Sequence, residues 1–406
     1  MLVKRRLLFI SPRFLFPLDQ GGKIRTSNIL RAMKGGAFEI TLASPAPANA
    51  SAFDADIASL CDRFVSWPEP AGSILRKLVA LGGSLPIPVA TDRSAAGGGV
   101  IETEFALRPD IIVVDFPHAH VLLPRLAAPP PMVMFTHNVE AEIFERHAEV
   151  ARGPMRWLWA NQTRKMRRFE GAALRSYHSV IAVSARDAEA LCRDYGLASV
   201  DPIDTGVDLD FYPFQPPEAP PQDGGRLVFS GAMDSRSNID GITWLTEAIW
   251  PLIARRRPKI ELLVVGRNPA EAMVSKIKAA GLPVTFTGFV DDIRPHVASA
   301  DVSVIPLRVG SGTRIKAFEA MALGRPVVST RIGTEGLDIT PGTHFLERDT
   351  PEDFADAVIQ ILENPEASRT MAHAARTRLE ERFSWGHVAR QFEAICSRAM
   401  QASVLA

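Results

Sequence analysis

Short apolar runs of strand length alternate with stretches of helical periodicity from one end of the chain to the other. The apolar runs lie at 7–10, 39–43, 111–115, 132–136 and 180–183, and then at 227–230, 261–265, 284–287, 302–306 and 327–330. Helical patterns such as 238–254 and 269–280 separate them. Each run is largely continuous in apolar character, which is typical of a strand buried on both faces by crossover helices. The pattern therefore predicts an α/β fold built on parallel sheets.

A segment rich in proline and glycine, 213–225, divides this pattern into two halves. Its prolines cannot join a strand ladder or a helix interior, so the segment is best read as a linker. We expect a doubly wound, Rossmann-like domain over 1–212, a second one over 226–385, and a C-terminal helix over 386–406 that could return to the first domain. Two such domains would face each other across a cleft, with ligands beyond the carboxyl ends of the strands.

Composition narrows the class of protein. The 406 residues carry 46 basic and 46 acidic side chains, a formal net charge of zero, which argues against a general nucleic-acid binder. Cys61, Cys192 and Cys396 are far apart, so neither a disulfide framework nor a zinc site is expected. The N-terminal apolar run is too short for a signal peptide, and no window approaches the roughly 18 apolar residues of a membrane span. We expect a cytoplasmic protein, with peripheral membrane contact as an option.

The stretch 302–328 reads as strand, glycine loop, helix, glycine and strand. The loop residues Gly310, Ser311, Gly312 and Thr313 would present backbone N–H groups at a helix N-terminus, which suits an anion. Arg314 and Lys316 add two cations, and Glu319 in the second turn could accept hydrogen bonds from ligand hydroxyls. Diphosphate and ribose together suggest a nucleotide. The other interpretation is a basic helix start with one solvated glutamate, because a glycine loop alone is weak evidence.

Several motifs together resemble GT-B glycosyltransferases of family 4. They are, in chain order, THNVE at 136–140, AVS at 182–184, GVD at 206–208, FTGFVDDIRPHVASAD at 286–301, the loop and FEAMALGRPVV at 318–328, and FSW at 383–385. Each motif is modest by itself, but their order along nearly the whole chain is specific. The resemblance implies a retaining, metal-independent transfer of a sugar from a nucleoside-diphosphate sugar to an acceptor held by the N-terminal domain.

The resemblance also implies roles for residues of the second half. Glu319 matches the second member of a Glu-x7-Glu pair and would bind the ribose, whereas the first member is replaced by Ser311. The family often has an arginine and a lysine for the diphosphate where this chain has Ala232 and Ser237, so Arg314 and Lys316, with Arg236, would carry that charge. Further donor contacts are expected from Gly231, Phe289 and Val290.

In the first half, the resemblance implies that His137 contacts the donor sugar and that His118 and His120 lie on the acceptor side. The loop from Arg13 to Gly21 and Gly22 would close over donor phosphate or acceptor, although a simple turn is an equal reading. Two histidines at i and i+2 could bind a metal, but no third ligand has suitable spacing, so no metal and no other cofactor is expected.

The stretch 152–175 holds seven basic residues among aromatic ones. Such a helix can lie on an anionic bilayer, although a solvated helix with buried aromatics explains it as well. The sequence thus predicts a glycosyltransferase acting on a nucleotide sugar and a glycan or lipid-linked acceptor in polysaccharide or cell-envelope synthesis. The alternatives are a nucleotide-sugar 2-epimerase of the same fold and a non-catalytic nucleotide-sugar-binding component of an assembly complex. The donor base, the sugar, the acceptor and the oligomeric state cannot be deduced from the sequence.

Overall fold

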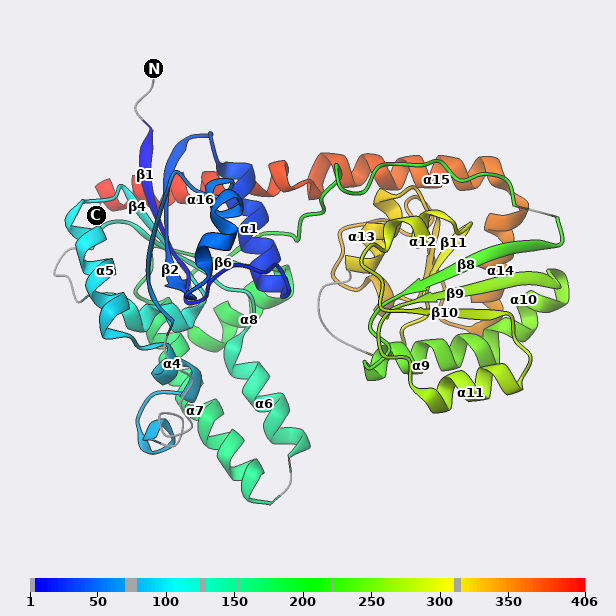
Figure 1. Ribbon diagram of the computed structural model, residues 1–406, viewed down its shortest axis with the longest axis horizontal. Coiled ribbons are helices and arrows are strands. Elements are labelled where there is room, and N and C mark those ends of the chain that lie inside the picture. Colours follow the sequence, from blue (N-terminus) through cyan, green and yellow to red (C-terminus); the bar gives the residue numbers. More distant parts are fainter. Residues whose placement is uncertain are drawn as a thin grey trace. The chain divides into compact units, whose positions relative to one another are not determined.

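The computed structural model describes residues 4–69, 79–124, 129–151, 153–220, 222–309 and 315–405. The chain forms two compact units (Figure 1): unit 1 is Met1–Thr205 with Trp385–Ala406, and unit 2 is Gly206–Ser384. Each unit is built on a parallel sheet with helices packed against it, so the predicted α/β fold with two doubly wound domains is confirmed. No helix in the described part of the chain combines the length and apolar character needed to cross a membrane.

The described residues of unit 1 contain a seven-stranded sheet of order β3-β2-β1-β4-β5-β6-β7, in which all pairs are parallel. Its strands are β1 (Arg5–Ile10), β2 (Phe38–Ala46), β3 (Arg63–Pro68), β4 (Ile111–Asp115), β5 (Met132–Phe135), β6 (Ser179–Ala182) and β7 (Asp201–Pro202). Its α-helices are α1 (Gly21–Met33), α2 (Asp54–Ala58), α4 (Ile87–Asp92), α5 (Ala95–Ala106), α6 (Glu140–Val150), α7 (Pro154–Leu174), α8 (Ala185–Tyr195) and α16 (Trp385–Leu405), with 3-10 helices η1 (Ala50–Phe53) and η2 (Pro117–Leu122).

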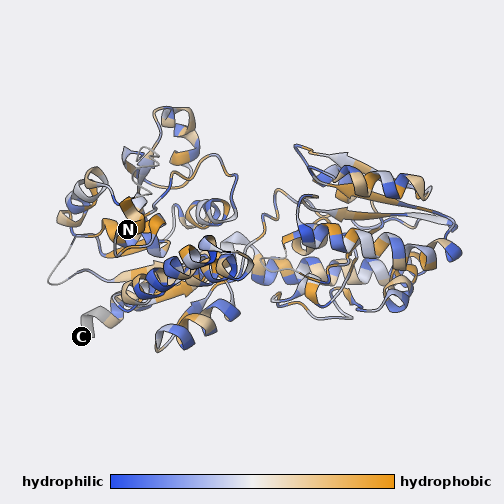
Figure 2. Ribbon diagram, turned by 90° about the horizontal axis from the view of Figure 1, so that it is seen from below, coloured by the Kyte–Doolittle hydropathy of each residue, from blue (hydrophilic) through white to orange (hydrophobic). Residues whose placement is uncertain are grey.

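Strand β1 shows how this sheet is covered on both faces. Leu7 and Phe9 join a hydrophobic cluster with residues of α1 and α16, whereas Leu8 and Ile10 join another with residues of α5 and α8. Successive side chains of a strand point to opposite faces, so a strand covered on both sides must be apolar at every position. Figure 2 shows the result, strands that are hydrophobic along their length and helices that alternate in character.

The described residues of unit 2 contain a six-stranded parallel sheet of order β10-β9-β8-β11-β12-β13. Its strands are β8 (Gly224–Ser230), β9 (Lys259–Val265), β10 (Val284–Gly288), β11 (Val302–Ile305), β12 (Val327–Ser329) and β13 (Leu346–Glu347). Its helices are α9 (Arg236–Trp244), the π-helical turn η3 (Leu245–Ile249), α10 (Trp250–Arg256), α11 (Glu271–Ala279), α12 (Arg294–Ala298), α13 (Ile315–Ala322), the 3-10 helix η4 (Ile332–Thr334), α14 (Pro351–Glu363), α15 (Pro365–Arg378) and the π-helical turn η5 (Leu379–Phe383).

The proline-rich segment differs from the expected linker over 213–225. Contacts place the boundary between the units at Thr205 and Gly206, and β8 already begins at Gly224. The ring of Phe214 lies 4.6 Å from that of His373 on α15, and the N–H of Gln215 donates to the carbonyl of Leu323 at 3.3 Å. Prolines keep this segment out of helices and ladders, but they do not prevent it from packing along unit 2.

At the other end of the chain, α16 packs against α1 of unit 1, and its Phe392 ring lies edge-on to Phe135 of β5 with the centroids 5.3 Å apart. The strands that the sequence pattern did not predict are β3, β7 and β13. β3 is an edge strand in which only Trp67 is buried, and the other two strands have two residues each, so none of them carries a long apolar run. The predicted helix 238–254 is interrupted by the π-helical turn η3.

Candidate active site

Helix α13 of unit 2 begins at Ile315, directly after the residues for which the sequence predicts a glycine loop. The predicted loop residues Gly310, Ser311, Gly312, Thr313 and Arg314 lie outside the described residues. The description resumes at Ile315, the first residue of α13. The described part of the site in unit 2 lies on α13 and at the ends of β8 and β10.

Glu319 of α13 is paired with a residue that the sequence did not single out. The hydroxyl of Tyr212 donates to Glu319 Oε1 at 2.9 Å. Burial raises the pKa of Glu319 above its ordinary value, against the hydrogen bond from Tyr212 and the charge of Lys316, which lower it. Burial and the neighbouring carboxylate likewise raise the pKa of Tyr212, so the phenol keeps its proton. One carboxylate oxygen is thus fixed by the phenol, which orients the group as an acceptor.

Lys316, one turn before Glu319, is held at the end of β8. Its Nζ donates to Asn238 Oδ1 at 2.9 Å and lies 4.2 Å from the centroid of the Phe229 ring. Gly231 follows β8 directly, with φ +148°, and a Cβ there would come within 3.0 Å of the lysine Nζ and 2.7 Å of Asn238 Nδ2. The structure thus brings together two of the predicted donor residues, Gly231 and Lys316.

The remaining predicted donor residues lie at neighbouring strand ends. Arg236 is the first residue of α9 and is exposed, and Phe289, after β10, is 73% exposed. Val290 instead packs against the hydrophobic core of unit 2. Because β10 is two strands from β8 in the sheet, Phe289 and Val290 belong to another part of the same edge. An exposed aromatic ring at this edge offers a surface on which a flat ring can stack.

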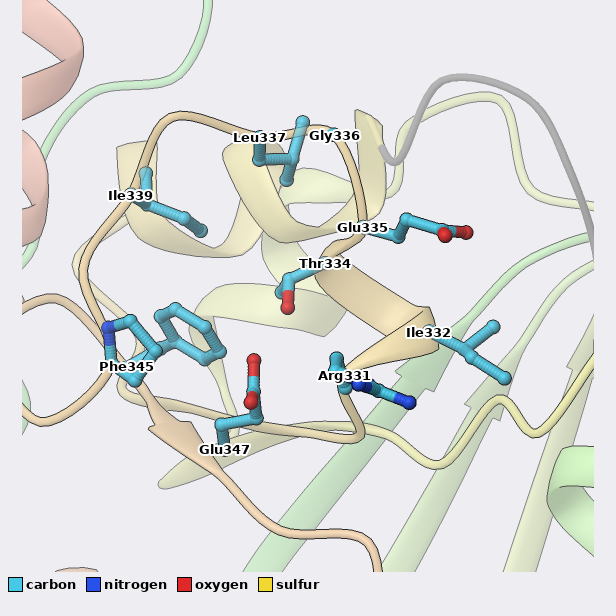
Figure 3. Close-up of a pocket in the computed structure, with 10 residues that line it drawn as sticks. Arg331, Ile332, Thr334, Glu335, Gly336, Leu337, Ile339, Phe345 and Glu347 are labelled. Carbon is cyan, nitrogen blue, oxygen red and sulfur yellow. The ribbon is translucent and has the colours of Figure 1, made fainter. Parts of the chain in front are cut away.

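A cavity of about 620 Å³ opens beyond the ends of β12 and β13 (Figure 3). Its polar lining comes from Arg331, Thr334, Glu335 and Glu347, and Leu337, Ile339 and Phe345 are among its apolar lining residues. The sequence pattern does not predict this cavity, because its lining residues are spread over seventeen positions without a motif. Carboxylates and a hydroxyl beside apolar walls are groups that suit a ligand rich in hydroxyls.

His137 in unit 1 is held by a buried carboxylate. Its Nε2 lies 2.7 Å from Asp115 Oδ1 and 3.4 Å from Thr26 Oγ1. Asp115 is fully buried and also accepts hydrogen bonds from Ser11 Oγ at 3.2 Å and Thr26 Oγ1 at 3.1 Å. Asp115, Ser11 and Thr26 come from β4, the end of β1 and α1, so the carboxyl edge of the sheet assembles this group.

An aromatic ring and a glycine complete the surroundings of His137. Phe116 stacks on the imidazole with centroids 4.2 Å apart and has φ +65°, a left-handed conformation that is costly for a residue with a Cβ. A Cβ on Gly22 would lie 2.8 Å from Phe116 Cζ and 3.7 Å from His137 Nδ1. Arg13 lies with its guanidinium carbon 5.6 Å from the Phe116 centroid. Gly21 starts α1 and has open space where a Cβ would be.

His118 and His120 contact different partners. His118 Nε2 lies 3.2 Å from Glu140 Oε2, and its Nδ1 lies 3.7 Å from Asp92 Oδ2. Burial opposes the charge of His118, but its two carboxylate partners outweigh burial and raise its pKa. His120 instead lies 3.1 Å from the hydroxyl of Tyr177, and burial lowers its pKa. No group of three or more metal-ligating His, Cys, Asp or Glu side chains occurs among the described residues.

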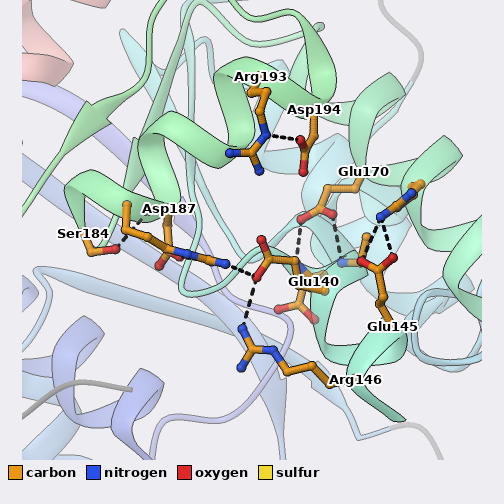
Figure 4. A network of polar contacts seen from close by, with 12 residues as sticks. Glu140, Glu145, Arg146, Glu170, Ser184, Asp187, Arg193 and Asp194 are labelled. Carbon is orange, nitrogen blue, oxygen red and sulfur yellow. Dashed lines mark hydrogen bonds and ion pairs between the residues drawn. The ribbon is translucent and has the colours of Figure 1, made fainter. Parts of the chain in front are cut away.

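Glu140 is itself positioned by a second buried carboxylate (Figure 4). Glu170 of α7 accepts the backbone N–H of Glu140 at 2.9 Å and that of Ala141 at 3.1 Å, which are the first two amides of α6. The hydroxyl of Tyr195 donates to Glu170 Oε2 at 2.5 Å. Burial raises the pKa of Glu170 to about 7 despite these donors. This carboxyl group caps α6 from outside the helix and so places Glu140 next to His118.

Known proteins resemble both units. The family described as Glycosyl transferases group 1 matches residues 224–364, and Glycosyltransferase Family 4 matches residues 21–211. The chain is 26% identical over 234 residues to the MMP alpha-(1->4)-mannosyltransferase of Mycolicibacterium hassiacum. The matched region covers 56% of this chain and 55% of that protein. The chain thus spans about half the length of this curated relative.

Two solved structures share the fold. A sucrose-phosphate synthase from Thermosynechococcus elongatus has a TM-score of 0.65 at 17% identity, covering 98% of this chain and 100% of that one. The Anabaena protein HepE in complex with UDP has a TM-score of 0.64 at 16% identity, covering 97% and 100%. At such identities the likeness establishes the GT-B fold alone. The family matches fall on the two units in chain order, and the chain therefore belongs to the group 1, family 4 glycosyltransferases.

Proposed function

We propose that this protein transfers a sugar from a nucleoside-diphosphate sugar to a hydroxyl of a glycan or lipid-linked acceptor, with retention of the anomeric configuration and without a metal. The observation that carries the proposal is the pair Lys316 and Glu319 on α13, directly after the glycine loop. An ammonium and a carboxylate one helical turn apart suit a diphosphate and the ribose hydroxyls beside it. HepE was solved with UDP, which supports a donor of this class.

The chemistry follows from where charge develops. The bond between the anomeric carbon and the phosphate oxygen breaks, its electrons go to the leaving diphosphate, and the acceptor oxygen forms the new bond. Lys316 and the N–H groups at the start of α13 offset the growing negative charge. In a retaining reaction the departing phosphate oxygen takes the acceptor proton, so no protein base is needed.

We propose that His137 binds a hydroxyl of the reacting sugar through Nδ1. Asp115 accepts hydrogen bonds from two hydroxyls, so it acts as an acceptor toward His137 as well, and the imidazole proton stays on Nε2. The tautomer with its proton on Nε2 has a lone pair on Nδ1. Among the described residues this buried nitrogen has no hydrogen-bond partner, and a sugar hydroxyl would supply one.

Ligand-dependent thermal stability tests the donor class. The melting temperature is measured with UDP, GDP, ADP and their sugars, because a ligand that binds only the folded protein stabilises it by mass action, by about 2.7 kcal/mol at a hundred times Kd. We expect one base to raise the melting temperature of the unchanged protein and the rise to shrink in Glu319→Ala. If no nucleoside diphosphate raises it and no sugar is transferred, the proposed function is wrong.

A second experiment tests His137 and the stereochemistry. His137→Ala should lower turnover by about tenfold to a thousandfold with nucleotide affinity nearly intact, since the lost contact is to the reacting sugar. His147→Ala is a matched control, because this ring stacks on Trp159 at 4.6 Å. NMR of the product from an α-linked donor should show an α linkage. A β-linked product would mean inversion, with the Asp115–His137 pair acting as base.

We further propose that α7 contacts an anionic membrane surface, where a lipid-linked acceptor would be found. Trp157 is 73% exposed, and Arg164 and Arg168 follow it at helical spacing and are also exposed. Cations flanking an exposed indole suit the headgroup region of a bilayer. Cosedimentation should occur with vesicles containing phosphatidylglycerol, weaken in Arg164→Glu, and be absent with phosphatidylcholine alone. Equal recovery with both vesicle types would contradict an electrostatic contact.

A further inference from the structure

The ammonium of Lys316 is fixed from two sides. The Phe229 ring, which is fully buried in β8, supports it with Nζ 4.2 Å from the ring centroid. Asn238 Oδ1 accepts its hydrogen bond at 2.9 Å. A lysine side chain has several rotatable bonds and loses considerable conformational entropy when it is ordered, so such contacts determine where the charge stands.

Asn238 is anchored in turn to the loop after β8. It is the third residue of α9 and only 8% exposed, and its Nδ2 donates to the carbonyl of Ala232 at 2.8 Å. Both ends of the amide are thus used, one on the β8–α9 loop and one on α13. The absence of a side chain at Gly231 makes room for this bridge, since a Cβ would lie 2.7 Å from Nδ2 and 3.0 Å from Lys316 Nζ.

The neutrality of this partner matters for the charge at the site. Some cations of unit 2 donate to carboxylates, for example Arg308 to Asp240 and Lys276 to Glu247. A carboxylate orients a cation but also offsets its charge, whereas an amide oxygen orients it and leaves its charge in place. Ala232 in this loop and Ser237 in the first turn of α9 carry no charge of their own.

We propose that Asn238 is a positioning residue that holds the Lys316 ammonium at the end of β8, where it receives the diphosphate of the donor. This inference rests on the proposed function. It predicts that Asn238 contributes to diphosphate affinity only through Lys316, and that a carboxylate at the same position is no substitute for the amide.

Calorimetry on the full chain tests the inference. The probes are the nucleoside diphosphate that best stabilises the unchanged protein and the corresponding nucleoside without phosphates. Asn238→Ala should weaken diphosphate binding about tenfold and leave nucleoside binding unchanged. A tenfold loss is at the lower end of the range expected when a hydrogen bond to a charged group is removed. Asn238→Asp should weaken it at least as much, because the carboxylate offsets the lysine charge and repels the phosphates. Thr243→Ala is the control, since its hydroxyl bonds only to Ile239 within α9.

A double-mutant cycle decides whether Asn238 acts through the lysine. The variant with both Asn238→Ala and Lys316→Ala should bind the diphosphate no more weakly than Lys316→Ala alone. Additive losses, or equal losses of diphosphate and nucleoside affinity in Asn238→Ala, would overturn the inference and leave Asn238 with a purely structural role. Failure of the unchanged protein to bind any nucleoside diphosphate would instead overturn the proposed function, so the two failures are distinguishable.

Discussion

Replacing Glu170 by glutamine should change how the stability of unit 1 depends on pH. The carboxyl group is fully buried and receives two backbone amides of α6 and the hydroxyl of Tyr195. Burial raises its pKa to about 7, from an ordinary value of 4.5. The folded protein therefore binds this proton more tightly than the unfolded chain, and unfolding releases it between these two pH values.

The sign and size of the change in stability follow from the difference between the pKa of Glu170 in the folded protein and its ordinary value. Since the unfolded chain holds fewer protons in this window, the free energy of unfolding falls as pH rises from about 4.5 to about 7. Each unit of difference in pKa corresponds to about 1.4 kcal/mol of stability. Over the whole interval the free energy of unfolding therefore falls by at most about 3 kcal/mol. Glu170→Gln keeps the size of the side chain but cannot titrate, so it should remove this part of the pH dependence.

Urea denaturation at several pH values between 5 and 8 measures the effect, with hydrogen exchange at the start of α6 as a local probe. The unchanged protein should lose about 2–3 kcal/mol more than Glu170→Gln across this range. Glu145→Gln is the matched control, because its carboxylate is an exposed partner of Arg167 on the same pair of helices. Identical pH profiles for the unchanged protein and Glu170→Gln would refute the reasoning.

Four further predictions concern the donor site and the reaction. Glu319→Ala should weaken nucleoside diphosphate binding by about 1.5–3 kcal/mol in calorimetry, and unchanged affinity would exclude the ribose role. Tyr212→Phe removes a hydrogen bond that lowers the pKa of Glu319. On acidification, the affinity of this variant for the diphosphate should therefore begin to fall at a higher pH than that of the unchanged protein. Lys316→Ala should lower kcat more than donor affinity, because charge grows on the leaving phosphate in the transition state, and equal losses would indicate simple binding. Transfer should survive EDTA; abolition with rescue by Mn²⁺ would contradict the metal-independent mechanism.

The parts of the fold that the sequence predicted are those with an unambiguous hydrophobic pattern. β4 reads Ile-Ile-Val-Val-Asp and is buried at every position, so its apolar run marks it directly. β3 reads Arg-Phe-Val-Ser-Trp-Pro and is half exposed at the edge of the sheet, where neither a continuous run nor strict alternation is required. β3 is thus recognised from its pairing with β2, which the sequence does not display.

In the candidate site, too, residues in local motifs can be predicted from the sequence, whereas residues that depend on distant contacts cannot. Lys316, Glu319 and His137 were found because each stands in a local motif. Asp115 and Asn238 were missed, because their roles depend on contacts 22 and 78 residues away in the chain. A signal for Asp115 did exist, since a carboxylate at the end of a wholly apolar strand must find buried donors.

His118 and His120 show how local geometry separates the partners of two residues that are close in sequence. In a strand, side chains at i and i+2 point to the same side, and the two rings would share one ligand. The residues lie instead in η2, a 3-10 helix of three residues per turn, which sets side chains two positions apart about 240° from each other. His118 therefore turns toward Glu140 and Asp92, and His120 toward Tyr177. Any contribution to acceptor binding must then come from each histidine separately, and His118 brings with it the two carboxylates that raise its pKa.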